Sequence, residues 1–166
     1  LYPFAADPSQ QLARMDGDDI KPLIEGAEYL FTNEYEAALI EQKTGWTAAD
    51  LAAMVNVRVI TLGPDGARIE RRGCEPVLVG VPEEESKADP TGVGDAFRAG
   101  FLAGQSWGLS DERSAQVGSL VATYVIETIG TQEYQLAQQH FLERLATAYG
   151  DDAAAEIDQH VSCPRP

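Results

Sequence analysis

The sequence predicts an α/β fold in which helices alternate with the strands of an open, mostly parallel sheet. Short apolar runs rich in β-branched residues, suited to buried strands, alternate with segments of helical periodicity. Capping residues and glycines stand where such helices would begin and end. The composition, 166 residues with 44% hydrophobic and 23% charged residues, is ordinary for one globular domain. Strands separated by helices favour a parallel sheet.

Five apolar runs are expected to form the strands. The third is the most strand-like, because a β-branched run begins at Val57 and continues to Leu62. Pro64-Asp65-Gly66 then signals a turn, so the next run should return as a hairpin. Asp7-Pro8-Ser9 and Thr32-Asn33 end the first two runs. The expected strands are residues 4–6, 29–31, 57–62, 67–70 and 76–81.

Helices are expected where apolar residues recur at helical spacing. Ile20, Leu23 and Ile24 should share the buried face of the first helix. Phe97, Phe101 and Leu102 are expected on the apolar side of the fourth helix, and a helix 136–149 is expected to be the last. The others should span 34–43, 48–55 and 110–127. The expected N-caps are Thr47 and Ser110, and the expected stops are Gly26, Gly45 and Gly108.

The charge balance argues against nucleic acid and anionic membrane surfaces as partners. Twelve Lys and Arg residues face 27 Asp and Glu residues, giving a formal net charge of −15. The cluster Arg68, Arg71 and Arg72 is best explained as a solvated hairpin. No apolar run is long enough to span a bilayer, and no secretory leader is expected. Cys74 and Cys163 have no metal-binding or redox spacing, which favours a reduced, cytoplasmic protein.

The segment from Asp89 to Asp95 is the most informative in the chain. Gly92 and Gly94 allow backbone N–H groups to converge, and the following helix presents unpaired donors at its N-terminus. Together they form a site suited to phosphate. A carboxylate at Asp95 suits phosphoryl transfer if it accepts the proton of the attacking hydroxyl. The plainer alternative is a tight turn with a capping Asp. Phe97 argues against a dinucleotide fingerprint, and no Walker A sequence is present.

The run Asp89-Pro90-Thr91-Gly92-Val93-Gly94-Asp95-Ala96-Phe97-Arg98-Ala99-Gly100 resembles the second signature of the ribokinase-like (PfkB) sugar and nucleoside kinases. The resemblance implies a ribokinase-like three-layer α/β/α fold. It also implies that Asp95 is the catalytic base, and that Gly92, Val93 and Gly94 form the anion hole. Arg98 lies one helical turn beyond Asp95, so the two side chains can meet or share a phosphate.

Asn33-Glu34-Tyr35-Glu36 resembles the Asn-x-x-Glu motif of the same family, which orders Mg²⁺ and phosphate largely through water. The resemblance implies that Asn33 and Glu36 serve this role. Mg²⁺ keeps several of its waters, so a carboxylate at the end of a strand can hold it indirectly. The alternative is that the two glutamates are ordinary first-turn acids, which the helix dipole favours.

Two further ligand sets are implied by the resemblance. The stretch from Thr61 to Gly66 is similar to the family's nucleotide-binding stretch, which contacts the phosphates and ribose of ATP. Its implied nucleotide-binding residues are Thr61, Gly63 and Gly66. A K⁺-like ion lies behind the anion loop in many members, and the matching positions are Asp89, Thr91 and the turn at Gly130. Asp89 has the alternative role of capping its loop.

Within the family, the chain resembles the actinobacterial adenosine kinases most. In that subgroup the two glutamines after Asp-Pro-Ser lie near the nucleoside, which implies that Gln10 and Gln11 bind the substrate, as Asp95 does. Exposed polar residues at the start of a helix are the alternative. The expected activity is ATP-dependent phosphorylation of a 5′-type hydroxyl of adenosine. A ribokinase- or fructokinase-like sugar kinase and a non-catalytic nucleotide- or partner-binding fragment are the alternatives.

The resemblance extends over the carboxyl-terminal half of such a kinase. Residues 1–150 correspond to its nucleotide side and catalytic base, and residues 151–166 are expected to form a tail with a frayed end. The lid strands and most substrate contacts belong to the amino-terminal half. We therefore expect the isolated chain to expose a sheet edge and apolar surface, and to be inactive. The expected partners are that half, a nucleoside or sugar, and a second copy in a homodimer.

Overall fold

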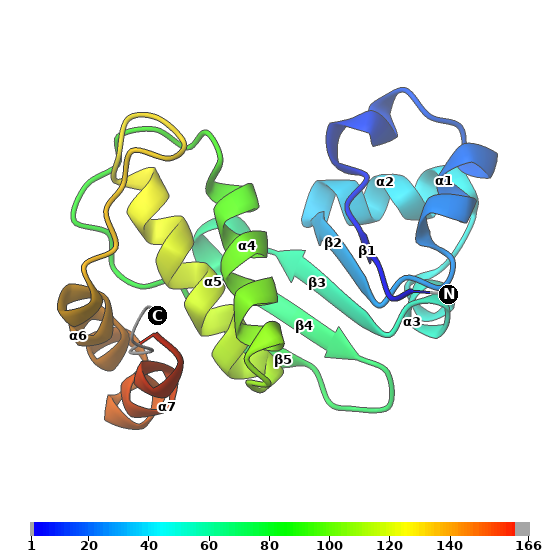
Figure 1. The fold of residues 1–166 in the computed structure, drawn as a ribbon. Helices are drawn as coiled ribbons and strands as arrows, with labels where there is room; N and C mark the ends of the chain where they lie inside the picture. The colour runs from blue at the N-terminus through cyan, green and yellow to red at the C-terminus, as the bar shows by residue number, and fades with distance from the viewer. Residues whose placement is uncertain (1, 162–166) are drawn as a thin grey trace. The chain divides into compact units, whose positions relative to one another are not determined.

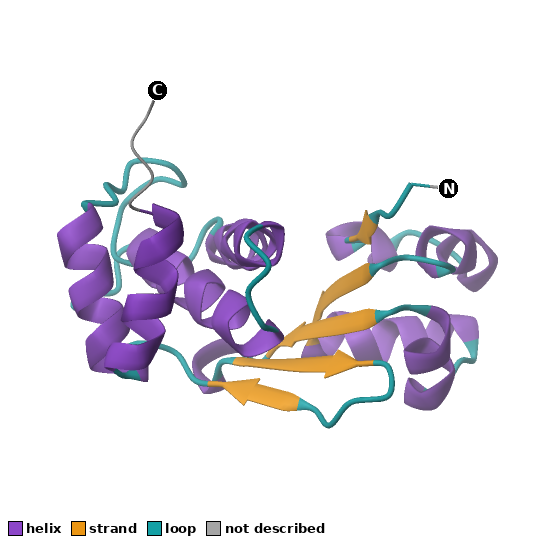
Figure 2. Cartoon of the chain, turned by 60° about the horizontal axis from the view of Figure 1, so that its bottom comes forward, coloured by secondary structure: helices purple, strands orange, loops and turns teal. Residues whose placement is uncertain are grey.

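The computed structural model describes residues 2–161, and the chain divides into two compact units between Leu78 and Val79. Unit 1 holds most of the sheet and its helices, and unit 2 is built mainly of helices (Figures 1 and 2). The fold is the α/β class that the alternation of strands and helices predicts. Within residues 2–161, no helix is both long and apolar enough to cross a membrane.

The sheet has five strands in the order β1-β2-β3-β4-β5. Its strands are β1 (Ala5–Ala6), β2 (Tyr29–Asn33), β3 (Val57–Thr61), β4 (Ala67–Arg71) and β5 (Val77–Val79). The strands β1, β2 and β3 are parallel, while β4 returns antiparallel to β3 as the turn signal predicts. The connection between β3 and β4 is a single 3₁₀ turn, η2 (Gly63–Asp65).

Unit 1 packs its helical segments against one face of the sheet. These segments are η1 (Ser9–Ala13), α1 (Gly17–Ile24), α2 (Glu34–Thr44) and α3 (Ala48–Met54). The buried cluster beneath them comprises Ala6, Leu12, Ile20, Ile24, Ala27, Leu30, Ile40, Leu51 and Val55. The expectation for Leu23 is wrong, because its side chain is 44% exposed. It lines a shallow groove together with Phe4 and Pro22, beside the edge strand β1.

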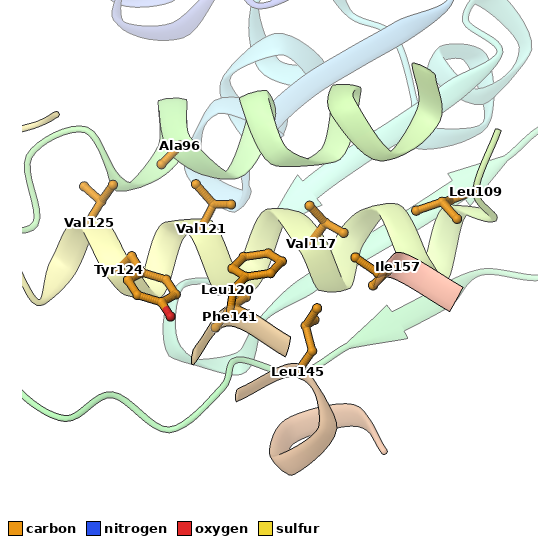
Figure 3. Close-up of a cluster of buried hydrophobic side chains, with 10 residues drawn as sticks. All are labelled: Ala96, Leu109, Val117, Leu120, Val121, Tyr124, Val125, Phe141, Leu145 and Ile157. Carbon is orange, nitrogen blue, oxygen red and sulfur yellow. The ribbon is translucent and has the colours of Figure 1, made fainter. Parts of the chain in front are cut away.

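Unit 2 is organised around α5 (Asp111–Ile126), which is buried along most of its length. Side chains of α5 meet α4 (Val93–Ser106), α6 (Gln138–Tyr149) and α7 (Asp151–Val161) in one apolar cluster (Figure 3). Phe97 and Phe101 are buried as expected. Leu102 is 37% exposed, against expectation, because it lies about 100° around the helix from Phe101.

The helix α7 was not expected from the sequence. It begins directly after Gly150, in the segment 151–166 that the composition suggested was a tail. Ala153 and Ile157 lie four residues apart on one face, and both are fully buried. The expected frayed end and Cys163 fall in residues 162–166, outside the described residues.

Local capping follows the sequence closely. Asn33 and Thr47 form capping boxes with Glu36 and Asp50, and the Ser110 side chain caps α5. Gly45 adopts the left-handed conformation after α2, with φ of 75°. The cap at Asn33 fixes where α2 begins relative to β2, and the other two caps fix where α3 and α5 begin after the helices that precede them.

Candidate functional site

Three of the predicted motifs lie at the carboxyl ends of neighbouring strands in unit 1. The parallel strands β1, β2 and β3 are neighbours, and Asn33 at the end of β2 is in register with Thr61 at the end of β3. Gln10 and Gln11 follow the carboxyl end of β1. Open α/β sheets bind ligands at the carboxyl ends of their parallel strands. The topology of unit 1 therefore brings the predicted substrate, metal and nucleotide motifs to the same end of the parallel strands.

The predicted Mg²⁺ motif is a capping box in the structure. The side-chain Oδ1 of Asn33 accepts a hydrogen bond from the Glu36 N–H at 2.8 Å, and Oε2 of Glu36 accepts one from the Asn33 N–H at 2.8 Å. Glu36 is only 8% exposed. This geometry gives both residues a structural role at the start of α2. Because a carboxylate can accept several hydrogen bonds, Glu36 still fits a contact to Mg²⁺ through water.

The predicted nucleotide stretch forms a tight turn at the end of β3. The Leu62 N–H donates to the Gly66 carbonyl at 2.8 Å, and the Gly66 N–H donates to the Gly63 carbonyl at 3.2 Å. Gly63 is exposed and nothing lies within 4 Å of the position that its Cβ would occupy. A phosphate or ribose can therefore approach this backbone closely.

The two glutamines of the predicted substrate segment lie on η1. Leu12 of this turn is buried at 1% exposure, whereas Gln10 and Gln11 are exposed. An amide both donates and accepts hydrogen bonds, as the edge of a base or a sugar hydroxyl requires. The turn thus anchors itself through Leu12 and presents two amides to solvent.

In unit 2, the glycine loop turns directly into α4. Gly92 is the N-cap residue and has φ of 84°, a conformation that side chains rarely adopt. A Cβ at this position would also lie 2.9 Å from Cγ2 of Thr131, so only glycine fits. Val93 and Gly94 are the first helical residues, and their N–H groups belong to the helix end that lacks intrahelical acceptors. This geometry is suited to an anion.

Asp95 lies in the first turn of α4, and its side chain is 83% exposed. Its Oδ1 accepts a hydrogen bond from Nη1 of Arg98 at 2.8 Å. The same Nη1 lies 3.3 Å from the position that a Cβ of Gly94 would occupy, so the guanidinium covers the first helical turn. The structure therefore places a carboxylate and a guanidinium together beside the candidate anion loop.

The positions predicted for a K⁺-like ion also come together within unit 2. Oδ1 of Asp89 accepts a hydrogen bond from the Thr91 N–H at 2.9 Å. Hydrogen bonds from the Thr91 hydroxyl and N–H, with a smaller one from the Gly130 backbone, hold the pKa of Asp89 below its ordinary value. Asp89 therefore caps its loop as a carboxylate. In residues 2–161, no three His, Cys, Asp or Glu side chains gather as a metal cluster.

A buried ion pair that the sequence did not reveal holds the loop before Asp89. The Arg144 guanidinium donates to both carboxylate oxygens of Glu127 at 2.7 Å, and the two side chains are 11% and 12% exposed. Glu127 also accepts the Glu85 N–H at 2.8 Å, and Arg144 donates to the Glu83 carbonyl at 3.0 Å. Burial is the largest single influence and acts to raise the pKa of Glu127, but the hydrogen bonds from Arg144 and the Glu85 N–H, together with the positive charge of Arg144, outweigh it and lower the pKa. No local pattern predicts this pair, since its members are far apart in sequence.

Comparisons with known proteins agree on one family. The family model "pfkB family carbohydrate kinase" matches residues 3–138. The nucleoside kinase of Methanocaldococcus jannaschii is 27% identical over 139 residues, covering 84% of this chain and 46% of that protein. The structure of Burkholderia thailandensis nucleoside kinase in complex with inosine is similar with a TM-score of 0.85 and 36% identity, over 89% of this chain and 49% of that one.

The adenosine kinase from Sinorhizobium meliloti is also similar, with a TM-score of 0.64 and 30% identity over 82% of this chain and 40% of that one. Its similarity is lower on both measures than that of the Burkholderia nucleoside kinase. The chain spans about half the length of the relatives it matches.

Proposed function

The chain belongs to the pfkB family of carbohydrate kinases, and on that premise we propose that it supplies the nucleotide side and catalytic base of an ATP-dependent nucleoside kinase. The observation that carries the proposal is the position of Asp95 in the first turn of α4, directly after the left-handed Gly92. An exposed carboxylate beside a cradle of N–H groups suits the transfer of a phosphoryl group to a hydroxyl. Adenosine is the first substrate to test.

In the proposed reaction, Asp95 accepts the proton of a primary hydroxyl on the substrate. The hydroxyl oxygen bonds to the γ-phosphorus of ATP, and the bond from that phosphorus to the β,γ-bridging oxygen breaks to release ADP. The N–H groups at Gly92, Val93 and Gly94 stabilise the charge on the transferred group. Mg²⁺, held through water by Glu36 and Asn33, would neutralise phosphate charge. Asp89 and Thr91 are the residues that would hold K⁺.

A nucleoside is favoured over a free sugar because Gln10 and Gln11 follow Asp-Pro-Ser, as do the two glutamines near the nucleoside in the adenosine kinases that the chain resembles. The similarity to a nucleoside kinase solved with inosine supports the same substrate class. A sugar kinase is the second candidate, since an uncharacterized sugar kinase of Archaeoglobus fulgidus is 30% identical over 129 residues. A fragment that only binds a nucleotide or a partner would have no use for a base at Asp95.

The substrate class can be tested by assaying the full gene product with ATP and Mg²⁺ against adenosine, inosine, ribose and fructose. We expect adenosine or inosine to have a kcat/KM at least about tenfold above either sugar, because only a nucleoside offers a base edge to the amides. A preference for ribose or fructose would favour the sugar kinase. ATP binding without turnover on any of the four would favour the binding fragment.

We also propose that an amino-terminal half completes this unit at the free edge of β1. The strand β1 is at the end of the strand order, and Phe4 beside it is 41% exposed. Leu23 lines the same groove at 44% exposure. An edge strand flanked by exposed apolar side chains invites pairing with another strand.

The isolated 166-residue chain is expected to form dimers or larger species and to have no kinase activity. Light scattering after size exclusion would measure its mass, and co-expression with the amino-terminal half should restore a one-to-one complex and turnover. An active complex whose mass shows two copies of the 166-residue chain would support the homodimer. A monomeric, soluble and active isolated chain would show that no such half is needed.

A further inference from the structure

Lys43 ties the segment that carries Gln10 and Gln11 to the end of α2. Its ammonium donates to the carbonyl oxygens of Leu12 and Met15 at 2.6 Å, and to that of Ala13 at 3.2 Å. An ammonium has three protons, so this side chain meets three acceptors with three donors. The acceptors are the carbonyl groups at and just after the end of η1, where a cation is electrostatically favoured.

Three other features restrain the same segment. Ser9 at its start has φ of 47°, a strained conformation for a residue other than glycine, which persists only where the surroundings hold it. Just beyond its far end, a Cβ on Gly17 would collide with the Lys43 carbonyl oxygen, so the backbone here touches the last turn of α2. Leu12 anchors the middle of the segment in the core of unit 1.

The segment is tightly held, although Gln10 and Gln11 within it are exposed. Segment 9–15 is short and lies at the surface, yet it is held by a strained start, a buried anchor and an ammonium clamp. Surface turns are usually more mobile than the elements that they connect, so the restraints on this one call for an explanation. Restraint of this kind fixes the directions of the two exposed side chains, which is what recognition of a rigid ligand requires.

We propose that Lys43 is a positioning residue, whose ammonium holds residues 9–15 so that the amides of Gln10 and Gln11 meet the base or ribose of a nucleoside. This inference rests on the proposed function and adds a residue that never touches the substrate. Loss of the Lys43 ammonium should weaken binding of the nucleoside and not of ATP, because its three acceptors all lie in the substrate segment.

The test replaces Lys43 by methionine, which keeps the length of the side chain and removes the donors. In the full gene product, Lys43→Met should raise the KM for adenosine about tenfold or more while the KM for ATP changes less than about twofold. Hydrogen exchange of the amides in residues 10–16 should rise by about tenfold. Lys43→Gln keeps two donors on a shorter side chain. Its KM for adenosine and its exchange rates should lie between those of the unsubstituted protein and those of Lys43→Met.

Lys21→Met is the matched control, because the Lys21 ammonium pairs with the exposed Asp18 at 3.3 Å outside the segment. It should leave both KM values and the exchange of residues 10–16 unchanged. Unchanged exchange in Lys43→Met, or faster exchange with an unchanged KM for adenosine, would overturn the inference. Absence of nucleoside turnover in the unsubstituted protein would contradict the proposed function, and with it this inference. That failure is seen without any variant, so it is distinguishable from a failure of the inference about Lys43 alone.

Discussion

Replacing Asp95 by asparagine is expected to lower the kcat of the full gene product by about 10³-fold, which is the usual size of a general-base contribution. Asparagine keeps the shape of the side chain but cannot accept the proton of the attacking hydroxyl. The KM for ATP should change little, because the N–H groups of the glycine loop remain. Steady-state kinetics with adenosine and ATP measure both constants.

The substitution should not unfold the protein. The Asp95 side chain is 83% exposed, and surface substitutions usually change the free energy of unfolding by less than about 0.5 kcal/mol. Asp152→Asn is the matched control, because Asp152 is another exposed acid in the first turn of a helix of unit 2. It should retain the full kcat. Denaturation curves of both variants would exclude a loss of fold as the cause.

Arg98 provides the second control, because Asp95→Asn also weakens the pair at 2.8 Å. Arg98→Gln removes the guanidinium and keeps the base. If Arg98 shares a phosphate with Asp95, this variant should raise the KM for ATP about tenfold and leave most of kcat. Equal losses of kcat in the two variants would show that the ion pair matters, and not the base. Near-full turnover in Asp95→Asn would contradict the proposed mechanism.

The features that the sequence predicted well depend on neighbours along the chain. The capping of α3 by Thr47, the stop at Gly45 and the turn at Gly92 each involve residues a few positions apart, so their patterns are visible in the sequence. The three motifs of unit 1 each follow a predicted strand. They lie at the same end of the sheet because parallel strands place their carboxyl ends together.

The features that the sequence did not predict depend on partners far away in the chain. Lys43 binds carbonyls 28 to 31 residues before it, and Arg144 binds a carboxylate 17 residues before it. Backbone carbonyls carry no side-chain identity, so no pattern marks them. The helix α7 was missed for a related reason, since its buried face rests on little more than Ala153 and Ile157.

The motif Asn33 to Glu36 shows how one pattern can carry two meanings. The resemblance assigns Asn33 and Glu36 to Mg²⁺, and the structure uses the same two side chains to cap α2. The two roles are compatible, because capping uses Oε2 of Glu36 and leaves its other oxygen for a bridging water. A cap that also fixes a carboxylate at the end of a strand is a natural way to build such a site.

The contact between α4 and α5 explains Gly100, which so far has a place only in the family signature, and also Gly104 and Gly118, which no motif includes. The two helices lie side by side in unit 2 (Figure 1). A Cβ on Gly100 would lie 2.8 Å from Cα of Gly118, and a Cβ on Gly104 would lie 2.7 Å from Cα of Ser114. Small residues four apart on each helix therefore let the two backbones touch, which holds the helix that carries Asp95.

Gly118→Ala should accordingly destabilise unit 2, although alanine is the better helix former by about 1 kcal/mol. Its Cβ would lie 2.7 Å from the carbonyl oxygen of Phe97 and 3.2 Å from the N atom of Phe101. Backbone atoms in a packed helix cannot move aside cheaply, and overpacking of this kind costs about 1–3 kcal/mol or more. We expect a net loss of about 1–2 kcal/mol, opposite in sign to the helix propensity.

Urea denaturation followed by Trp107 fluorescence in a Trp46→Phe background would report on unit 2, because Trp107 packs against its apolar cluster. Gly80→Ala is the control, since nothing lies within 4 Å of the position of its Cβ. That variant should differ from the parent by less than about 0.5 kcal/mol. A stabilised Gly118→Ala would mean that helix propensity outweighs the contact, and that α4 and α5 do not approach as closely as their glycines allow.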